Sequence, residues 1–406
     1  MSIIYVCMRR AGGVAPYGDS VIAASTAMLA IEPQSRHYVC VAICDILSPK
    51  AEKYEKGMIN IMKLHDRKPD INNIYKVFRG EPPSRPTLFE LFLNRPLYER
   101  LAQRTLPADS ADPGLDNLLL VIDAYAAAGY DYATSHGCDI SFKNERSKPE
   151  GKDTLSLNQG YVITDEASFE AYEWPVPEKC DYSRLEKAEA YMPEGMKLMV
   201  MGPGGVLENA IGLTGYDNLC FMLYENPGLA KAVFDKVGSC LLRYYEIAAQ
   251  YPAAGFIMSN DDWGFKSQTF LSPEHMREYV LPWHKKIVET AHARNLPAVL
   301  HSCGNLEEVM DDVIDYCGFD AKHSYEDIIM PVEDVYEKYH GRIAVLGGVD
   351  VDYIINRPDS DITARCRGML KRAEGRGGYA LGTGNSVPEY VPQDKYLTMI
   401  KAALEY

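Results

Sequence analysis

The stretch LPAVLHSCGNLEEVMDDVIDYCGFD, residues 296–320, indicates a strand followed by a helix. It begins with a short apolar run that is typical of a buried strand. Apolar residues then recur at helical spacing until Gly318, a residue type that commonly ends helices. Asn305 is predicted to cap this helix, with Glu308 as its capping-box partner.

His301 and Cys303 stand at the carboxyl end of the predicted strand. Residues two apart on a strand point the same way, so both side chains can face one ligand. In α/β proteins this end of a parallel strand is where ligands bind. An imidazole and a thiol together favour a metal of borderline softness. The alternative is a buried histidine beside a small apolar cysteine.

The charge of the chain limits its partners. The 406 residues carry a net charge of −15 at pH 7. Because nucleic acids and anionic membranes are bound through basic surfaces, this charge argues against both. No apolar run reaches the roughly 18 residues that a membrane-spanning helix needs.

The cysteines indicate a reducing compartment. Ten of them are scattered along the chain without paired spacing, and no clear signal peptide precedes them. This pattern predicts reduced thiols in a cytoplasmic protein. The sequence leaves the oligomeric state open.

Residues 1–57 differ from the rest of the chain, because their apolar runs have no partners in the periodic pattern. We interpret them as an atypical N-terminal extension, peripheral or poorly ordered. A true start at Met58 or Met62 is the alternative. The regular pattern begins at Asn72, and residues 72–406 are predicted to form the main domain.

Eight short apolar runs in this domain are predicted strands, and most are followed by a helical pattern. Eight such units favour an α/β fold of the (β/α)₈ TIM-barrel type over an open doubly wound sheet. Polar residues 140–195 are predicted to form an insertion after the second strand. The predicted strands are Thr87–Glu90, Tyr130–Ser135, Lys197–Met201, Ala254–Met258, Pro297–Leu300, Phe319–Lys322, Ile343–Leu346 and Tyr379–Leu381.

Polar side chains follow the carboxyl ends of most of these strands. Closing the barrel brings those ends onto one face, so a single pocket is predicted there. Asp350 is expected to cap a helix rather than to face the pocket. The candidate pocket residues are Glu90, His136, Asn260, Asp261, Asp262, His301, Cys303, His323, Asn385 and Ser386.

Several motifs together resemble the uroporphyrinogen decarboxylase superfamily, and within it the branch of corrinoid-dependent methyltransferases. They occur in family order from about residue 72 to the C-terminus. The motifs are Asp261-Asp-Trp-Gly-Phe, His301-Ser-Cys-Gly-Asn, Asp320-Ala-Lys-His-Ser, Leu346-Gly-Gly-Val-Asp and Gly382-Thr-Gly-Asn-Ser-Val-Pro.

The resemblance implies a (β/α)₈ barrel whose site lies at the strand ends, and zinc held by a His-x-Cys pair and a later cysteine. His301 and Cys303 match the pair, but the later cysteine position holds Asn385. The third ligand is therefore open: a carboxylate of Asp261 or Asp262, or His323, is the substitute.

Uroporphyrinogen decarboxylases of this superfamily carry an arginine-rich motif after the first strand, which binds the carboxylates of the substrate. Residues 88–94 hold no arginine, and Thr383 replaces the family's histidine between two glycines near the eighth strand. The resemblance therefore favours a methyltransferase over a porphyrinogen decarboxylase.

The expected reaction is methyl transfer between a small methylated compound, of the methoxy or methylamine type, and a corrinoid. The chain has no corrinoid-binding Asp-x-His-x-x-Gly motif, so cobalamin is expected from a partner protein.

Each pocket residue has an expected part in that reaction. His301 and Cys303 would hold the metal, and His323 would donate a proton to the leaving atom. Asp261 and Asp262 would act as ligands, as support for the ligands or as acid and base, or else only cap a turn. The substrate would be bound by Glu90, His136, Asn260, Asn385 and Ser386.

Two other functions stay open. One is a decarboxylase or lyase that acts on a smaller acid without a corrinoid. The other is a non-catalytic barrel that docks a corrinoid protein or binds a ligand. His323 also has a purely structural interpretation as a buried, hydrogen-bonded histidine.

Overall fold

The computed structural model describes residues 64–145 and 156–406. The predicted N-terminal extension, residues 1–57, and the alternative starts at Met58 and Met62 lie outside the described residues.

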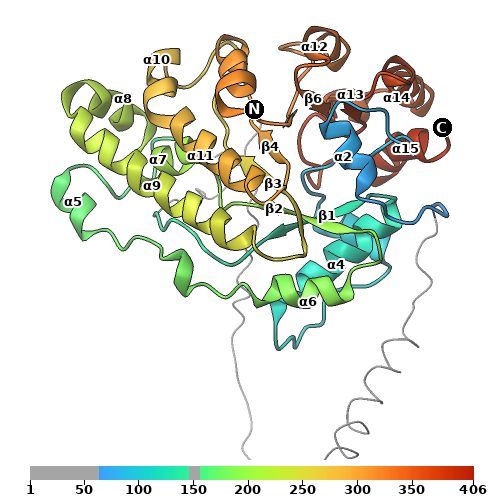
Figure 1. Ribbon diagram of the computed structural model, residues 1–406, viewed down its shortest axis with the longest axis horizontal. Helices are drawn as coiled ribbons and strands as arrows, with labels where there is room; N and C mark the ends of the chain where they lie inside the picture. The colour runs from blue at the N-terminus through green and yellow to red at the C-terminus, as the bar shows by residue number, and fades with distance from the viewer. Residues whose placement is uncertain (1–63, 146–155) are drawn as a thin grey trace, which may run out of the picture. The chain divides into compact units, whose positions relative to one another are not determined.

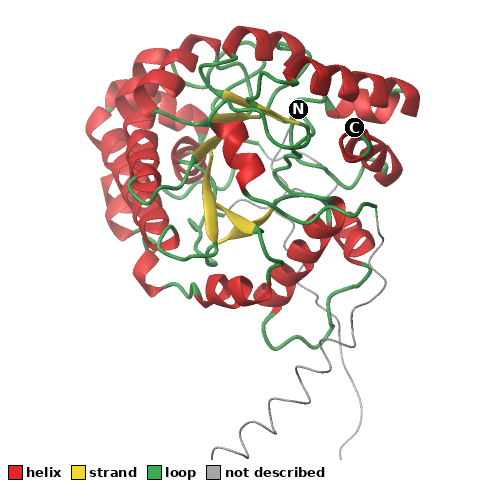
Figure 2. Ribbon diagram, turned by 45° about the vertical axis from the view of Figure 1, so that its right-hand side comes forward, coloured by secondary structure: helices red, strands yellow, loops and turns green. Residues whose placement is uncertain are grey.

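Seven parallel strands form one sheet and pair in chain order. The strands lie along an arc, and helices surround them on the outside (Figures 1 and 2). This parallel α/β arrangement confirms the predicted fold class at the level of a curled, barrel-like sheet. The strands are β1 (Tyr132–His136), β2 (Lys197–Met201), β3 (Ala254–Asn260), β4 (Ala298–His301), β5 (Ala321–His323), β6 (Ala344–Leu346) and β7 (Tyr379–Ala380).

The first predicted strand, residues 87–90, is an extended segment rather than a strand of the sheet. It makes one parallel bridge, between Leu88 and Leu381 just after β7. On the side of β1, the backbone N–H of Glu90 donates to the hydroxyl of Tyr132, and that hydroxyl also lies 2.7 Å from the carbonyl oxygen of Glu90. A side chain thus takes the hydrogen bonds that a neighbouring strand would make, and the eight-stranded prediction is wrong at this segment.

Helices follow most strands and cover the outer face of the sheet. No helix of the described ranges is long and apolar enough to cross a membrane. The helices are α2 (Asn72–Phe78), α3 (Arg95–Ala102), α4 (Pro113–Ala128), α5 (Glu166–Ala171), α6 (Ser183–Tyr191), α7 (Val206–Thr214), α8 (Tyr216–Glu225), α9 (Pro227–Ala248), α10 (Pro273–His275), α11 (Leu281–His292), α12 (Val332–Tyr339), α13 (Val351–Asn356), α14 (Asp359–Ala373) and α15 (Gln393–Leu404), with short 3₁₀ or π segments η1 (Pro177–Lys179), η2 (Met276–Val280), η3 (Glu307–Val309) and η4 (Asp312–Cys317).

The helix after β4 differs from the prediction at its start. The side chain of Asn305 accepts a hydrogen bond from the amide of Glu307 at 3.0 Å, not from that of Glu308. This closes a local turn, so the segment begins as the 3₁₀ turn η3 and continues into the π-helical η4. The capping-box prediction is therefore wrong, whereas the end of the helix at Gly318, with φ of 78°, is confirmed.

The stretch between β1 and β2, where an insertion is predicted, carries α5, η1 and α6 in its described part. The backbone amides of Val162 and Ile163 attach this stretch to the rest of the domain. Both donate to the carbonyl oxygen of Leu213 at the end of α7.

A cluster of aromatic side chains fills the space beneath residues 87–90. Tyr132 packs against Phe89 at 5.6 Å and against Phe256 at 5.0 Å between ring centroids. Tyr125 and Tyr130 continue the cluster, with centroids 4.8 Å apart. These rings fix the extended segment against the sheet by burial as well as by hydrogen bonds.

Closure between residues 87–90 and β7 depends on Gly382. A Cβ atom there would collide with the backbone carbonyl oxygen of Phe89. We expect Gly382→Ala to lower the free energy of unfolding by about 1 to 3 kcal/mol, because the two backbones must move apart. Gly368→Ala in α14 is the control, since its Cβ would meet open space. Urea denaturation measures both, and equal stability of Gly382→Ala and the wild type would contradict this account of closure.

Candidate metal centre at the strand ends

Three side chains with metal-binding atoms meet at the carboxyl ends of β3 and β4. One ligand atom each of Asp262, His301 and Cys303 lies within 4.8 Å of the other two. The Nε2 atom of His301 is 3.8 Å from the Sγ atom of Cys303 and 3.7 Å from an oxygen of Asp262. The prediction that His301 and Cys303 face the same way is confirmed.

Hydrogen bonds between the two loops position these three groups. The amide of Cys303 donates to the Oδ1 atom of Asp262 at 2.9 Å. The amide of Trp263, the residue after Asp262, donates to the hydroxyl of Ser302, the residue before Cys303, at 3.2 Å. Gly304 takes a φ of 92°, and a Cβ atom there would collide with the backbone of the β3 loop. The loops therefore hold the carboxylate, imidazole and thiol together before any ligand binds.

A buried histidine sets the proton position on His301. The Nε2 atom of His323 lies 3.1 Å from the carbonyl oxygen of Thr383, which can only accept a hydrogen bond. Burial lowers the pKa of His323 to about 3, so its neutral ring carries its single proton on Nε2. Its Nδ1 atom, 2.8 Å from Nδ1 of His301, must then accept. His301 is thus protonated on Nδ1, and the lone pair of its Nε2 atom points toward Cys303 and Asp262.

Burial also controls the charges of the three groups. The pKa of His301 lies well below its usual range, because burial and then His323 disfavour the imidazolium. Burial raises the pKa of the Cys303 thiol, and the Asp262 carboxylate raises it further. Burial raises the pKa of Asp262 as well. A bound cation would reverse the cost of charging both the thiol and the carboxyl group.

Asn385, at the position where the family resemblance places a cysteine, contacts the sulfur instead. Its Nδ2 atom lies 3.1 Å from the Sγ atom of Cys303, as a donor to that sulfur. Its Oδ1 atom accepts from the amide of Ser386 at 2.7 Å, which fixes the orientation of the amide group. The third candidate ligand is therefore the carboxylate of Asp262, one of the substitutes left open by the sequence.

Asp261 faces away from this cluster. Its two oxygens accept hydrogen bonds from the amides of Leu207 and Glu208 in the first turn of α7, both at 2.9 Å. The Nε2 atom of the fully buried His284 lies 2.8 Å from the same carboxylate. The two aspartates therefore differ: Asp261 anchors α7 and is not among the possible metal ligands, whereas Asp262 is one of them.

The other predicted pocket residues are spread around the strand ends. His136 is exposed at the end of β1, and Asn260 ends β3 with a buried Oδ1 atom that has no hydrogen-bond partner. Glu90 is fully buried against Thr383. Asp350 caps α13 through the amides of residues 352 and 353, as its sequence context predicts.

Sequence reasoning missed two residues that matter here. Glu208 is half-buried beside the cluster, where its carboxylate accepts from the amide of Gly205 at 3.2 Å. Burial, and then Asp262 and Asp261, raise its pKa well above the usual range. Thr383 was noted only as a replacement for the family's histidine, although its place between two glycines marks a tight backbone approach.

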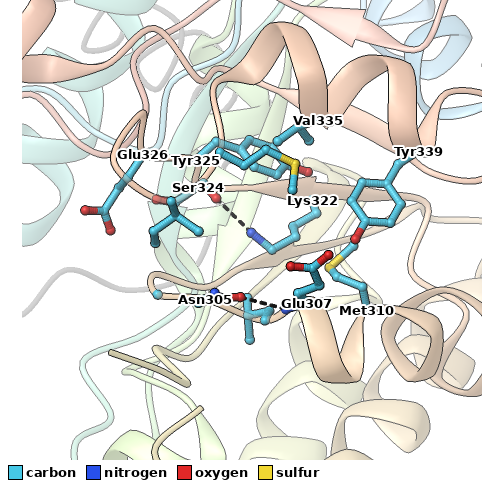
Figure 3. A pocket seen from close by; sticks show the side chains of 13 residues that line it. Asn305, Glu307, Met310, Lys322, Ser324, Tyr325, Glu326, Val335 and Tyr339 are labelled. Atoms are coloured by element: carbon cyan, nitrogen blue, oxygen red, sulfur yellow. Dashed lines mark hydrogen bonds between the residues drawn. The ribbon is translucent and has the colours of Figure 1, made fainter. Parts of the chain in front are cut away.

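A small pocket of about 50 Å³ is lined by residues of the loops after β4 and β5 and by Lys322 of β5 (Figure 3). Lys322 reaches into it and donates to the carbonyl oxygens of Ser324 at 2.7 Å and Ser302 at 3.3 Å. Burial lowers the pKa of this lysine to about 8. The side chain links the loops after β4 and β5, and its charge acts on the nearby Cys303 and Asp262. Other lining residues are Asn305, Glu307, Met310, Tyr325, Glu326, Val335 and Tyr339.

The donor set fits zinc. Zn²⁺ accepts imidazole nitrogen, thiolate sulfur and carboxylate oxygen, with bonds of about 2.0 to 2.3 Å in a tetrahedron. Such bonds separate ligand atoms by roughly 3.3 to 3.8 Å. The separations of 3.8 and 3.7 Å from Nε2 of His301 lie in or close to this range. Three protein ligands would leave a fourth position for a substrate, as in catalytic zinc sites.

Comparisons with known proteins agree with the architecture. The family model described as "Uroporphyrinogen decarboxylase (URO-D)" matches residues 180–406. A uroporphyrinogen decarboxylase of Anaeromyxobacter dehalogenans is 25% identical over 318 residues, which cover 75% of this chain and 84% of that protein. The methylated-thiol–coenzyme M methyltransferase of Methanosarcina mazei is 24% identical over 181 residues, 43% of this chain and 46% of that protein.

Among solved structures, a methyltransferase from Methanosarcina mazei superposes with a TM-score of 0.64. The match covers 84% of this chain and 99% of the other at 16% sequence identity. At this identity the likeness supports the fold alone.

Mutations of the two adjacent aspartates should have different effects on stability and on zinc binding. We expect Asp261→Asn to lower the free energy of unfolding by about 1 to 3 kcal/mol, because it weakens the anchoring of α7, and to leave zinc binding intact. Asp262→Asn should keep the stability nearly unchanged and weaken zinc binding at least tenfold. Denaturation curves and competitive zinc titration on each variant measure this, and the reverse pattern would contradict the assignment.

Proposed function

Because the chain belongs to the uroporphyrinogen decarboxylase family, we propose that it is a methyltransferase that moves a methyl group between a small methylated compound and a corrinoid protein. The cluster of Asp262, His301 and Cys303 carries this proposal, since it offers zinc three ligands at the strand ends. The similarity to a methylated-thiol–coenzyme M methyltransferase supports the same reaction class.

Zinc bound there would act as a Lewis acid on the heteroatom that gives or receives the methyl group. The protein residues prepare the site for this chemistry. His323 keeps the Nε2 atom of His301 free of a proton, and Asn385 donates a hydrogen bond to the sulfur of Cys303. Such contacts to metal ligands fix their orientation and adjust their basicity.

The expected role of His323 as a proton donor needs correction. Both of its ring nitrogens are engaged, by Thr383 and by His301, and its pKa of about 3 leaves it neutral at ordinary pH. We propose instead that His323 positions His301. Substrate contacts fall to His136, which is exposed, and to Asn260, whose Oδ1 atom lacks a partner.

The partner and the substrate belong to the proposal as well. The corrinoid would come from a separate protein that docks at the strand ends, and the methyl donor would be a methoxy- or methylamine-type compound. The seven cysteines of the described ranges are free thiols, which favours a reducing compartment such as the cytoplasm.

Decarboxylation is the second candidate, favoured by the similarity to uroporphyrinogen decarboxylases over three quarters of the chain. A porphyrinogen with many carboxylates needs cationic side chains. Within the described part of the chain, Asp262, His301 and Cys303 make no hydrogen bond or ion pair with an arginine. One cationic side chain, Lys322, lies near them, but it donates to the carbonyl oxygens of Ser302 and Ser324. This environment favours methyl transfer over porphyrinogen decarboxylation.

Metal content tests the proposed centre. Protein purified without chelators should contain about one zinc per chain by elemental analysis, because the site offers three ligands. Cys303→Ala should lose the zinc, whereas the control Cys317→Ala should keep it, since Cys317 is buried beside the carbonyl of Leu281. A metal-free wild type, or equal loss in both variants, would overturn the zinc site.

Turnover tests the reaction class. The zinc-loaded protein, given a methylated amine or methoxy compound, should convert free cob(I)alamin to methylcobalamin, followed by absorbance. Cys303→Ala should be inactive in the same assay. Release of carbon dioxide from a porphyrinogen, without any methylation of cobalamin, would establish the decarboxylase alternative instead.

A further inference from the structure

Glu90 is a fully buried carboxyl group without a cation nearby. Its Oε2 atom accepts a hydrogen bond from the amide of Thr383 at 3.2 Å, and its Oε1 atom lies 2.6 Å from the hydroxyl of the same residue. No ion pair of the described residues includes it. A buried carboxylate normally needs a cation or several donors, so this environment favours the neutral acid.

The hydrogen-bond geometry at Thr383 also indicates that Glu90 is protonated. The Oγ1 atom of Thr383 lies 2.6 Å from Glu90 and also 2.6 Å from the carbonyl oxygen of Asn385. A hydroxyl group has one proton, and the carbonyl can only accept. The hydroxyl therefore donates to Asn385, and the proton between Thr383 and Glu90 must come from the carboxyl group.

We propose that Glu90 is a protonated positioning residue whose proton, through Thr383, holds both Asn385 and His323 in place against the metal-binding side chains. This inference rests on the proposed metal centre. It replaces the expected role of Glu90 in orienting a substrate, because the side chain is buried behind residue 383.

Thr383 connects the acid to both side chains of the His-x-Cys pair. Its hydroxyl donates to the carbonyl of Asn385, whose side chain donates to Cys303. Its own carbonyl accepts from His323, which in turn accepts from His301. If Glu90 were ionised, the hydroxyl of Thr383 would donate to Glu90 instead of to the carbonyl of Asn385. Asn385 would then lose this hydrogen bond, and its contact with the sulfur of Cys303 would loosen.

The titratable groups around Glu90 do not supply a charge that would stabilise its anion. Burial raises its pKa to about 8, with the contacts to Thr383 and to the backbone of Leu91 acting in the opposite direction. The neighbouring groups that interact with it electrostatically are phenols with raised pKa values, and His323 beyond Thr383 is neutral. The phenols are Tyr98, Tyr125, Tyr130, Tyr132 and Tyr396.

Infrared difference spectroscopy on the metal-free protein tests the protonation directly. The wild type minus Glu90→Gln should show the carbonyl stretch of a carboxylic acid at pH 6.5, and this band should vanish as the pH rises through about 8. Thr383→Val should shift the band, because it removes the acceptor of the acid proton. A spectrum without the band at pH 6.5 would overturn the proposal.

Cobalt(II) titration tests the link to the metal centre, because its absorption reports ligand geometry. Glu90→Gln should bind cobalt within about threefold of the wild type at pH 7, since a glutamine amide donates to the hydroxyl and accepts from the amide as the acid does. Glu90→Leu, which can do neither, should bind about 10- to 100-fold more weakly.

The pH profile separates this role from a merely structural one. Above pH 8 the cobalt affinity of the wild type should fall relative to that of Glu90→Gln, by at most about tenfold per pH unit. A Glu90→Gln variant that folds but loses cobalt binding, or parallel pH profiles, would overturn the proposal. Failure of the wild type to bind cobalt or zinc at all would instead reject the metal centre itself.

Discussion

The hydrogen bond between the Nδ1 atoms of His301 and His323 is the contact on which the candidate site depends. Two buried neutral rings can share only one proton there, and the carbonyl of Thr383 decides which ring supplies it. The result is a free lone pair on Nε2 of His301, directed at a thiol and a carboxylate. A tautomer that a free histidine adopts only part of the time is thus fixed by the fold.

The curled sheet makes this contact available. β4 and β5 are neighbouring parallel strands, paired in register at these two histidines. The loop after β7 then brings Thr383 and Asn385 across the strand ends. Residues 87–90 join the same loop through one backbone bridge and through Glu90. Because residues 87–90 pair with this edge of the sheet through only one bridge, side chains complete the closure of the barrel. The same segment therefore also supports the candidate site.

The sequence predicted much of this arrangement. Strand periodicity located all seven strands of the sheet to within a few residues, and the spacing of His301 and Cys303 placed both side chains on one face. It could not assign the two aspartates, because residues 261 and 262 have the same chemistry and differ only in which side of the turn they face. Nor could it reveal the role of Thr383, because its backbone and hydroxyl contact Glu90 and His323, which are far from it in the sequence.

The most direct test of the account is the ligand set of the zinc-loaded protein by X-ray absorption spectroscopy. The account predicts one sulfur ligand at about 2.3 Å, from Cys303, with nitrogen and oxygen ligands at about 2.0 to 2.2 Å. The oxygen signal should change in Asp262→Asn and not in Asp261→Asn. Two sulfur ligands, or none, would contradict the assignment of Asp262, His301 and Cys303 as the metal-binding set.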